Sequence, residues 1–164
     1  MIDHLSLPVS DVNATARAYT QALAPLGYSV LMSFTREQIP QLPHAQSVGL
    51  GARGKPDLWL RPSRHQIDGT HIAFAANDRK TVDAFHAAAL AAGMTDDGLP
   101  GVRQHYHPNY YGAFVKDADG HSIEVVCHSP VVVKKAASSA KKIAAPAKKK
   151  VAAKKAKPAA KKRK

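Results

Sequence analysis

The sequence predicts an α+β fold built from two copies of a β-α-β-β-β module. The segment DHLSLPVSDVNATARAYTQALAPLGY, 3–28, aligns with THIAFAANDRKTVDAFHAAALAAGM, 70–94. Both segments open with a histidine, His4 or His71, in a short stretch of alternating apolar residues, and both continue into an Ala-rich amphipathic stretch. Self-similarity of this kind indicates repeated supersecondary units, and one sheet with one helix per unit is α+β architecture.

Each module is expected to hold one helix. Ser10 or Asp11 suits the N-cap of the first helix and Asp78 that of the second, while Gly27 and Gly93 mark the ends. The first helix is predicted to turn inward the apolar residues Val12, Ala16, Tyr19, Leu23 and Leu26. For the second helix the corresponding residues are Val82, Phe85, Ala89 and Leu90.

The strands are predicted from stretches of period two and from short apolar runs bounded by turn residues. In the first module the predicted strands are 2–9, YSVLMSF, QSVGLGA and DLWLRP. In the second module they are the opening strand within 70–75, a poorly defined piece near 99–106, YYGAFVKD and HSIEVVCH. The turn-rich segment PSRHQIDG separates modules of about 1–64 and 68–130. Two such curled sheets are expected to face a shared cleft.

The charge is divided unevenly along the chain. Of the 24 Lys and Arg residues, 14 lie in 131–164, which holds no acid, so ten face all 12 acids in 1–130 and that body carries a net charge of −2. The tail is Lys/Ala/Pro-rich and is predicted to be disordered, because it has too little apolar area to fold. It resembles the tails of linker histones and histone-like bacterial proteins, which implies nonspecific binding of nucleic acid or another polyanion. A solubilising tail with no dedicated partner is the alternative.

Cysteine use and the N-terminus favour an intracellular protein. Cys127 is the only cysteine, so no intrachain disulfide forms, which fits a reducing compartment. The sequence shows neither a signal peptide nor a membrane-spanning run. We expect a cytoplasmic protein without membrane contact, associated with nucleoid or chromatin if the tail binds nucleic acid.

Strand alternation places three metal-binding residue types on comparable faces. His4, His71 and Glu124 each occupy the less apolar face of a predicted strand, with the larger aliphatic side chains on the opposite face. A single strand Glu or His is more often a surface or core residue than a ligand. The repeat makes the two histidines equivalent, however, and two imidazoles with one carboxylate form a common set for a divalent metal with open positions.

The body resembles the vicinal oxygen chelate superfamily, which includes glyoxalase I, fosfomycin-resistance thiol transferases, bleomycin-resistance proteins and extradiol dioxygenases. IDHLSLPVSD, GTHIAFAA and above all YYGAFVKDADGHSIEVV carry the resemblance, which covers nearly all of 1–130. It implies metal ligation by His4, His71 and Glu124. Trp59 stands about where glyoxalase I has a fourth ligand, a Glu, so the resemblance favours a three-ligand site.

The resemblance implies a metal-dependent enzyme that acts on a small molecule with two adjacent oxygens. Fe²⁺, Mn²⁺, Ni²⁺, Co²⁺ and Zn²⁺ all suit His and carboxylate ligands. Lyase or isomerase chemistry, thiol transfer and dioxygenase chemistry stay open, and a non-catalytic binding protein of the bleomycin-resistance kind is the alternative. The paired modules are completed either within one chain or by exchange in a homodimer, which is common in the family.

Four further residues are candidates around the site. If the turn is Asp117–Gly120, Ala113 lies opposite Glu124 and Tyr111 shares the face of that glutamate, whereas a register shift of one residue would put Tyr110 there instead. Tyr111 is then a candidate hydrogen-bond donor, and His107 a candidate general base. Trp59 is a candidate substrate-pocket wall. Phe114, another pocket candidate, stands about where extradiol dioxygenases carry a tyrosine, which weakens that reading.

Overall fold

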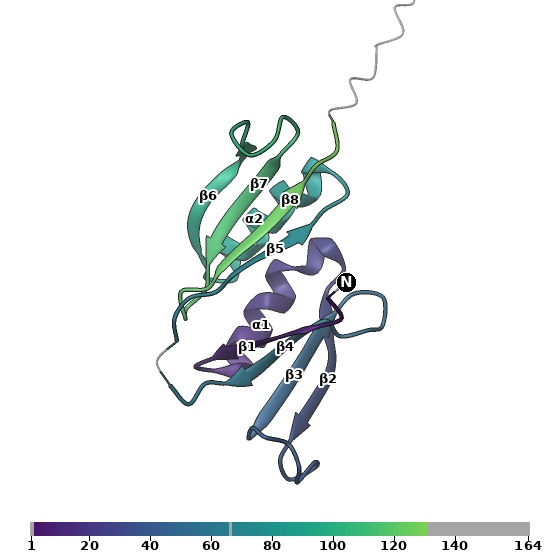
Figure 1. Ribbon diagram of the computed structural model, residues 1–164, viewed down its shortest axis with the longest axis vertical. Coiled ribbons are helices and arrows are strands. Elements are labelled where there is room, and N and C mark those ends of the chain that lie inside the picture. The colour runs from purple at the N-terminus through teal and green to yellow at the C-terminus, as the bar shows by residue number, and fades with distance from the viewer. Residues whose placement is uncertain (1, 66, 131–164) are drawn as a thin grey trace, which may run out of the picture. The chain divides into compact units, whose positions relative to one another are not determined.

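Each module of the chain places one helix against one four-stranded mixed sheet. The computed structural model describes residues 2–65 and 67–130 (Figure 1). The first module contains β1 (Leu5–Val9), α1 (Val12–Ala22), the 3-10 helix η1 (Ala24–Leu26), β2 (Ser29–Thr35), β3 (Gln46–Gly51) and β4 (Leu58–Pro62). The second contains β5 (His71–Ala75), α2 (Arg79–Ala91), β6 (Thr95–Val102), β7 (Tyr111–Lys116) and β8 (Ser122–Cys127).

The two sheets have the same topology, which confirms the predicted repeat. Their strand orders are β1-β4-β3-β2 and β5-β8-β7-β6, and in each sheet the first and last strands of the module pair in parallel. The other pairs are antiparallel. The α+β class and the β-α-β-β-β order therefore agree with the sequence prediction.

The predicted N-caps of both helices and the end of the second helix are confirmed, whereas the first α-helix ends at Ala22, before the predicted stop at Gly27. The Asp11 carboxylate accepts hydrogen bonds from two backbone N–H groups of the first turn of α1, and Asp78 does the same for one N–H of α2. Gly27 closes η1 with φ +82°, and Gly93 follows α2 with φ +87°, a left-handed conformation that side chains other than glycine rarely adopt. Leu90, predicted to face inward, is instead 41% exposed.

The boundaries of two strands differ from their predictions. Regular pairing of β1 begins at Leu5 and not at Ile2, which is exposed. The poorly defined piece near 99–106 is β6, and it lies earlier, at Thr95–Val102. Its ladder with β7 is interrupted twice by register shifts, which explains why period two is hard to see in the sequence.

One face of each sheet packs against its helix to form the core. In β1 the buried Leu7 and Val9 alternate with less buried residues, whereas in β8 Ile123 and Val125 belong to the core and the residue that follows each of them is buried as well. The opposite face of each sheet carries the polar residues, including His71, which is half exposed. That face is where the candidate ligands lie.

Both modules belong to one compact unit, and their helices contact each other. No helix in 2–65 or 67–130 is both long and apolar enough to cross a membrane. The predicted disordered tail, 131–164, lies outside the described residues.

Candidate metal and ligand site

The second module brings a histidine and a buried carboxylate together. Glu124 is only 2% exposed, and its Oε2 lies 3.1 Å from Nε2 of His71 on the neighbouring strand. Register explains the contact, because Glu124 pairs with Ala73, two residues along β5 and on the same face as His71. A carboxylate is rarely so buried without partners, so polar groups are expected at both of its oxygens.

Tyr110 supplies the second partner of this carboxylate. Its hydroxyl donates a short hydrogen bond to Oε1 of Glu124. Burial, and then this hydrogen bond and the nearby negative charge, raise the pKa of Tyr110, so the phenol stays protonated at neutral pH. Both oxygens of Glu124 are therefore oriented by the protein.

The predicted register of the last hairpin is wrong by one residue. Phe114 pairs with Glu124, and Ala113 pairs with Val125. The cause lies in the turn, where the Asp117 carboxylate accepts the N–H groups of both Asp119 and His121 and so adds a fifth residue to it.

The shift exchanges the roles of two adjacent tyrosines. Tyr110 faces Glu124, whereas Tyr111 points to the helix side and donates a hydrogen bond of 2.7 Å to Asp83 of α2. That bond is the main cause of the raised pKa of Tyr111. The structure thus does not bring Tyr111 to the glutamate, and Tyr110 is the residue that the assumed turn length missed.

The surroundings of Glu124 combine a close approach of the β7 backbone with an aromatic wall. A Cβ at Gly112 would lie 2.9 Å from Oε1 of Glu124, so any larger residue there would press on the carboxylate. Phe114 lies on the same face, with its ring stacked at 6.2 Å from the His71 ring. Arg103 lies in the loop between β6 and β7, and its guanidinium is 5.6 Å from the centre of the Phe114 ring.

His71 is oriented from its other nitrogen. Its Nδ1 lies 3.2 Å from Oγ of Ser122, whose hydroxyl donates to Oδ2 of Asp97 at 3.3 Å. If Nδ1 carries the proton, Nε2 presents a lone pair beside Glu124. Outer hydrogen bonds of this kind fix the tautomer of metal-binding histidines.

The first module carries His4 in a separate groove. This groove has a volume of about 350 Å³ and is lined by His4, Ser6, Phe34, Ile39, Leu42, Pro43, His44, Ser47 and Trp59. Trp59 stacks on Phe34 with 6.2 Å between ring centres, so the groove has an aromatic wall. His4 itself is exposed, and its Nδ1 bonds to Asp3 at 2.9 Å.

Register shows that Trp59 and Glu124 are equivalent positions of the two modules. Trp59 pairs with Ser6, which lies two residues after the first-strand histidine, and Glu124 pairs with Ala73, two residues after the corresponding histidine. The last strand of the first module therefore offers an indole where the second offers a carboxylate.

The three predicted ligands do not meet within one chain. Among the described residues, the only group of three or more His, Cys, Asp or Glu with ligand atoms within 4.8 Å of one another is Asp117, Asp119 and His121. His71 and Glu124 come together, and His4 lies apart from them.

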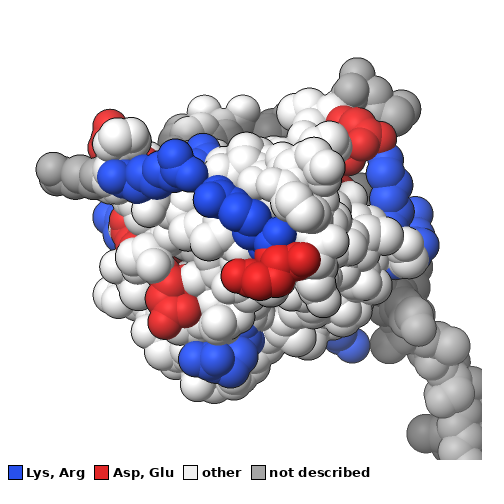
Figure 2. Space-filling view, turned by 90° about the horizontal axis from the view of Figure 1, so that it is seen from below, with Lys and Arg blue, Asp and Glu red and all other residues white. Residues whose placement is uncertain are grey.

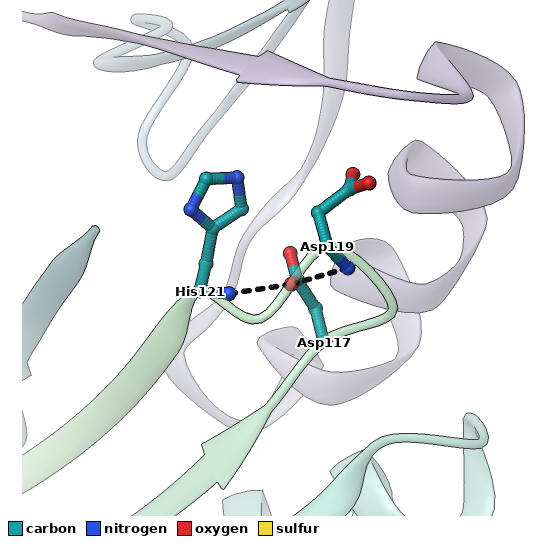
Figure 3. Close-up of side chains that lie close together, drawn as sticks. All are labelled: Asp117, Asp119 and His121. Carbon is teal, nitrogen blue, oxygen red and sulfur yellow. Dashed lines mark hydrogen bonds between the residues drawn. The ribbon is translucent and has the colours of Figure 1, made fainter. Parts of the chain in front are cut away.

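The group of Asp117, Asp119 and His121 is a hydrogen-bonded junction between the modules. Figure 3 shows the Asp117 carboxylate turned to the backbone N–H groups of the other two residues. Its other oxygen accepts from the Tyr19 hydroxyl of α1 at 2.7 Å, and Asp119 accepts from the Ser10 N–H at 2.9 Å.

The histidine of this junction has no free nitrogen. Nδ1 of His121 accepts the Thr70 N–H at 3.0 Å, and Nε2 donates to the Pro8 carbonyl of β1 at 2.9 Å. His121 is fully buried, so both bonds are shielded from water. A metal ion here would have to displace these bonds, so the arrangement fits a structural link better than a metal centre.

His107 lies near the site but does not touch its carboxylate. Its Nδ1 accepts the Asn109 N–H at 3.2 Å, and its ring centre lies 6.0 Å from that of His128. The His128 ring in turn lies 5.1 Å from Tyr110. His107 thus belongs to an aromatic cluster behind Tyr110, and within the described part of the chain it makes no hydrogen bond to Glu124.

The fold agrees with the family to which the sequence of the chain is matched. Residues 1–125 match the family model of the Glyoxalase/Bleomycin resistance protein/Dioxygenase superfamily. The chain belongs to this superfamily. A comparison with curated protein sequences found no match.

Solved structures of this superfamily share the fold. A glyoxalase/bleomycin resistance protein from Albidiferax ferrireducens is similar with a TM-score of 0.58 and 23% identity, covering 78% of this chain and 98% of that one. The fosfomycin resistance protein FosX from Listeria monocytogenes has a TM-score of 0.56 and 17% identity, covering 77% and 92%. A mutant of FosX, solved with Mn(II) and 1S,2S-dihydroxypropylphosphonic acid, has a TM-score of 0.56 and 17% identity, covering 77% and 88%.

Proposed function

We propose that this protein is a metal-dependent enzyme that acts on a small molecule with two adjacent oxygens. The observation that carries the proposal is the buried Glu124 carboxylate, held between His71 and Tyr110 on the open face of the second sheet. The Mn(II) complex of FosX supports it by analogy of fold. Lyase, isomerase, thiol transferase and dioxygenase chemistry are all compatible with these residues.

The donor set fits a divalent ion. Imidazole and carboxylate together suit Mn²⁺, Fe²⁺, Co²⁺, Ni²⁺ and Zn²⁺. Gly112 lets the β7 backbone lie close to Oε1 of Glu124, and the hydroxyl of Ser122 orients His71. A bound ion would act as a Lewis acid that stabilises negative charge on the substrate oxygens. Tyr110, protonated at neutral pH, donates its hydroxyl proton to Oε1 of Glu124 and so would keep this ligand oriented.

The third ligand is proposed to come from a second copy of the chain. In one chain the sheet faces that carry His4 and His71 are exposed, while their opposite faces pack on helices. A homodimer in which the first module of one chain faces the second module of the other would cover both faces. Each of its two equivalent clefts would contain His4 from one chain with His71 and Glu124 from the other.

Metal titration of the full chain tests the ligand set. Mn²⁺ binding, followed by the loss of the free-ion electron paramagnetic resonance signal, is expected at one ion per chain. His4→Ala, His71→Ala and Glu124→Ala should each abolish it, whereas His107→Ala, on the outer side of the aromatic cluster, should not. Unchanged Mn²⁺ binding in the Glu124→Ala variant would refute the proposal.

Mixing two inactive variants tests whether the site is shared. A heterodimer of the His4→Ala and Glu124→Ala chains has one cleft with both changes and one with neither. Random re-association of equal amounts should therefore restore about a quarter of the sites. If the mixture binds no Mn²⁺ although subunits exchange, the three ligands do not come from two chains.

A non-catalytic binding protein is the second candidate, favoured by the groove with the Trp59–Phe34 wall. Such a protein would keep its ligand affinity when Glu124 is changed and metal is removed. An enzyme of the proposed kind would lose turnover under both treatments.

We also propose that residues 131–164 bind nucleic acid without sequence preference, on the basis of their 14 cations and lack of acids. An electrophoretic shift of duplex DNA by the full chain should weaken steeply with salt and disappear when the chain is truncated after Pro130. Equal binding by the truncated chain would refute this role.

A further inference from the structure

Three arginines gather at the rim of the groove that contains His4 and Trp59. Nη2 of Arg36 and Nη2 of Arg64 both donate to the carbonyl oxygen of Pro43 at 3.1 Å, so these two nitrogens lie within about 6.2 Å of each other. Arg61 lies two residues after Trp59 on β4 and so shares its face. Pro43 itself lines the groove.

Among the described residues the three arginines form no ion pair with a carboxylate within 4.0 Å, although Glu37 lies close enough to Arg36 to be affected by its charge. The remaining positions, 1, 66 and 131–164, contain no Asp or Glu. Like charges at this separation repel each other, so the cluster is a site of unmet positive potential.

His44, which lines the groove, is affected by the positive charge of the three arginines. Burial, and then the three arginines, lower the pKa of His44 below its usual value. His44 is therefore neutral at pH 7 and can hydrogen-bond without adding a further charge. Figure 2 shows Lys and Arg side chains in a row over part of one face of the protein, and this row ends against acidic side chains.

We propose that this arginine cluster recognises an oxyanion of the substrate, a carboxylate, phosphate or phosphonate, while the Trp59–Phe34 wall contacts its apolar part. Guanidinium groups match the geometry of such oxyanions through paired hydrogen bonds. The inference rests on the proposed function, because it assigns the groove beside His4 to substrate recognition. It names the substrate class as a small anion with an aromatic or other flat group.

Tryptophan fluorescence offers a direct test, because Trp59 is the only tryptophan of the chain. The full-length protein is titrated with phenylphosphonate and with its neutral dimethyl ester, at constant ionic strength and with and without Mn²⁺. Phenylphosphonate should change Trp59 fluorescence saturably, and the ester should bind at least about tenfold more weakly, since it lacks the charge-assisted hydrogen bonds.

Variants connect the binding to the cluster. Arg64→Gln and the double change of Arg61→Gln with Arg64→Gln should weaken phenylphosphonate binding, the latter at least about tenfold. Arg17→Gln, an exposed arginine of α1 outside this groove, is the matched control and should bind as the wild type. Thermal melts establish that each variant is folded, and the exposed single variant Arg64→Gln serves if the double variant does not fold.

Equal affinity for the two probes, or an equal loss in the Arg17→Gln variant, would overturn the proposal. The two proposals can fail separately although His4 lines the same groove as Trp59, because the fluorescence reports Trp59 and the Mn²⁺ titration reports the ligands of the ion. Anion binding without Mn²⁺ binding would sink the proposed enzyme alone, and the reverse result would sink the oxyanion site alone.

Discussion

The first and second modules share their topology but differ in what their open sheet faces carry. At the equivalent strand position the first module has Trp59 and the second has Glu124. Around Trp59 lie a stacked Phe34 and a rim of arginines, whereas around Glu124 lie His71 and Tyr110. On the proposals above, the first module would contact a flat, anionic group and supply His4, while the second would supply the buried carboxylate and His71 that hold the cation.

The helices of the two modules show the same divergence. Counted from the capping residues Asp11 and Asp78, Tyr19 of α1 and His86 of α2 occupy the same position. His86 bonds to Asp96 within its own module at 2.7 Å, whereas Tyr19 bonds across to Asp117 of the other module. The repeated fold therefore determines the position of a side chain on its helix, and the residue type at that position determines which partner it bonds to.

The largest difference is expected when the two equivalent positions are changed alike. Glu124→Gln should weaken Mn²⁺ binding at least about a hundredfold, because it removes a charged ligand, and loss of an outer-shell partner alone costs 10–100-fold. Trp59→Gln, the matched change in the first module, should alter Mn²⁺ affinity by less than about threefold. The two titrations are compared by electron paramagnetic resonance, and equal losses would mean that the modules do not divide the chemistry in this way.

The junction between the modules should matter for stability and not for metal binding. Asp117→Ala removes three hydrogen bonds and leaves the buried Tyr19 hydroxyl without a partner, so unfolding should become easier by about 3 kcal/mol. Chemical denaturation measures this. Asp119→Ala, which loses only the bond from the Ser10 N–H, should cost about 1 kcal/mol.

The same variants discriminate between the two candidate metal centres. Both should bind Mn²⁺ as the wild type does. If Asp117→Ala abolished Mn²⁺ binding and Glu124→Gln preserved it, the junction would be the metal centre and the assignment above would be reversed.

Adjacent tyrosines provide a smaller test within the second module. Tyr110→Phe removes the donor to Glu124 and should weaken Mn²⁺ binding about tenfold. Tyr111→Phe removes the donor to Asp83 and should cost about 1 kcal/mol of stability with unchanged Mn²⁺ binding. If Tyr111→Phe weakened Mn²⁺ binding and Tyr110→Phe affected only stability, Tyr111 would face Glu124, as in the register predicted from the sequence.

Much of the fold could be predicted because its signals are local. The capping aspartates, the glycines after the helices and the period-two strands depend on neighbours along the chain. The pairing of β7 with β8 could not be obtained in the same way, since it depends on a carboxylate, Asp117, that draws His121 into the turn.

The sequence predicted the proximity of His71 and Glu124 but not the separation of His4 from them. His71 and Glu124 meet because their parallel strands are adjacent, and the repeat already places both on one face. The separation of His4 from them depends on how whole modules pack, through Tyr19 and His121, and such long-range contacts leave no periodic signal in the sequence. The arginine rim likewise joins residues from two loops and a strand.

The smallest effect concerns the helix contact that stays within the second module. The hydrogen bond from His86 is the main cause that lowers the pKa of Asp96 below its usual value. A carboxyl group whose pKa is lower in the folded state stabilises the protein above its unfolded pKa of about 3.9, and this contribution is lost as the pH falls through the lowered value.

Asp96→Ala should therefore lower Tm by no more than about 3 °C at pH 7, since Asp96 is exposed. The difference from the wild type should shrink below about pH 4, as measured by circular dichroism melts. A difference that stays constant from pH 7 to pH 3 would show that the hydrogen bond from His86 does not stabilise the ionised Asp96 carboxylate, and it would remove this contrast with the bond from Tyr19 to Asp117.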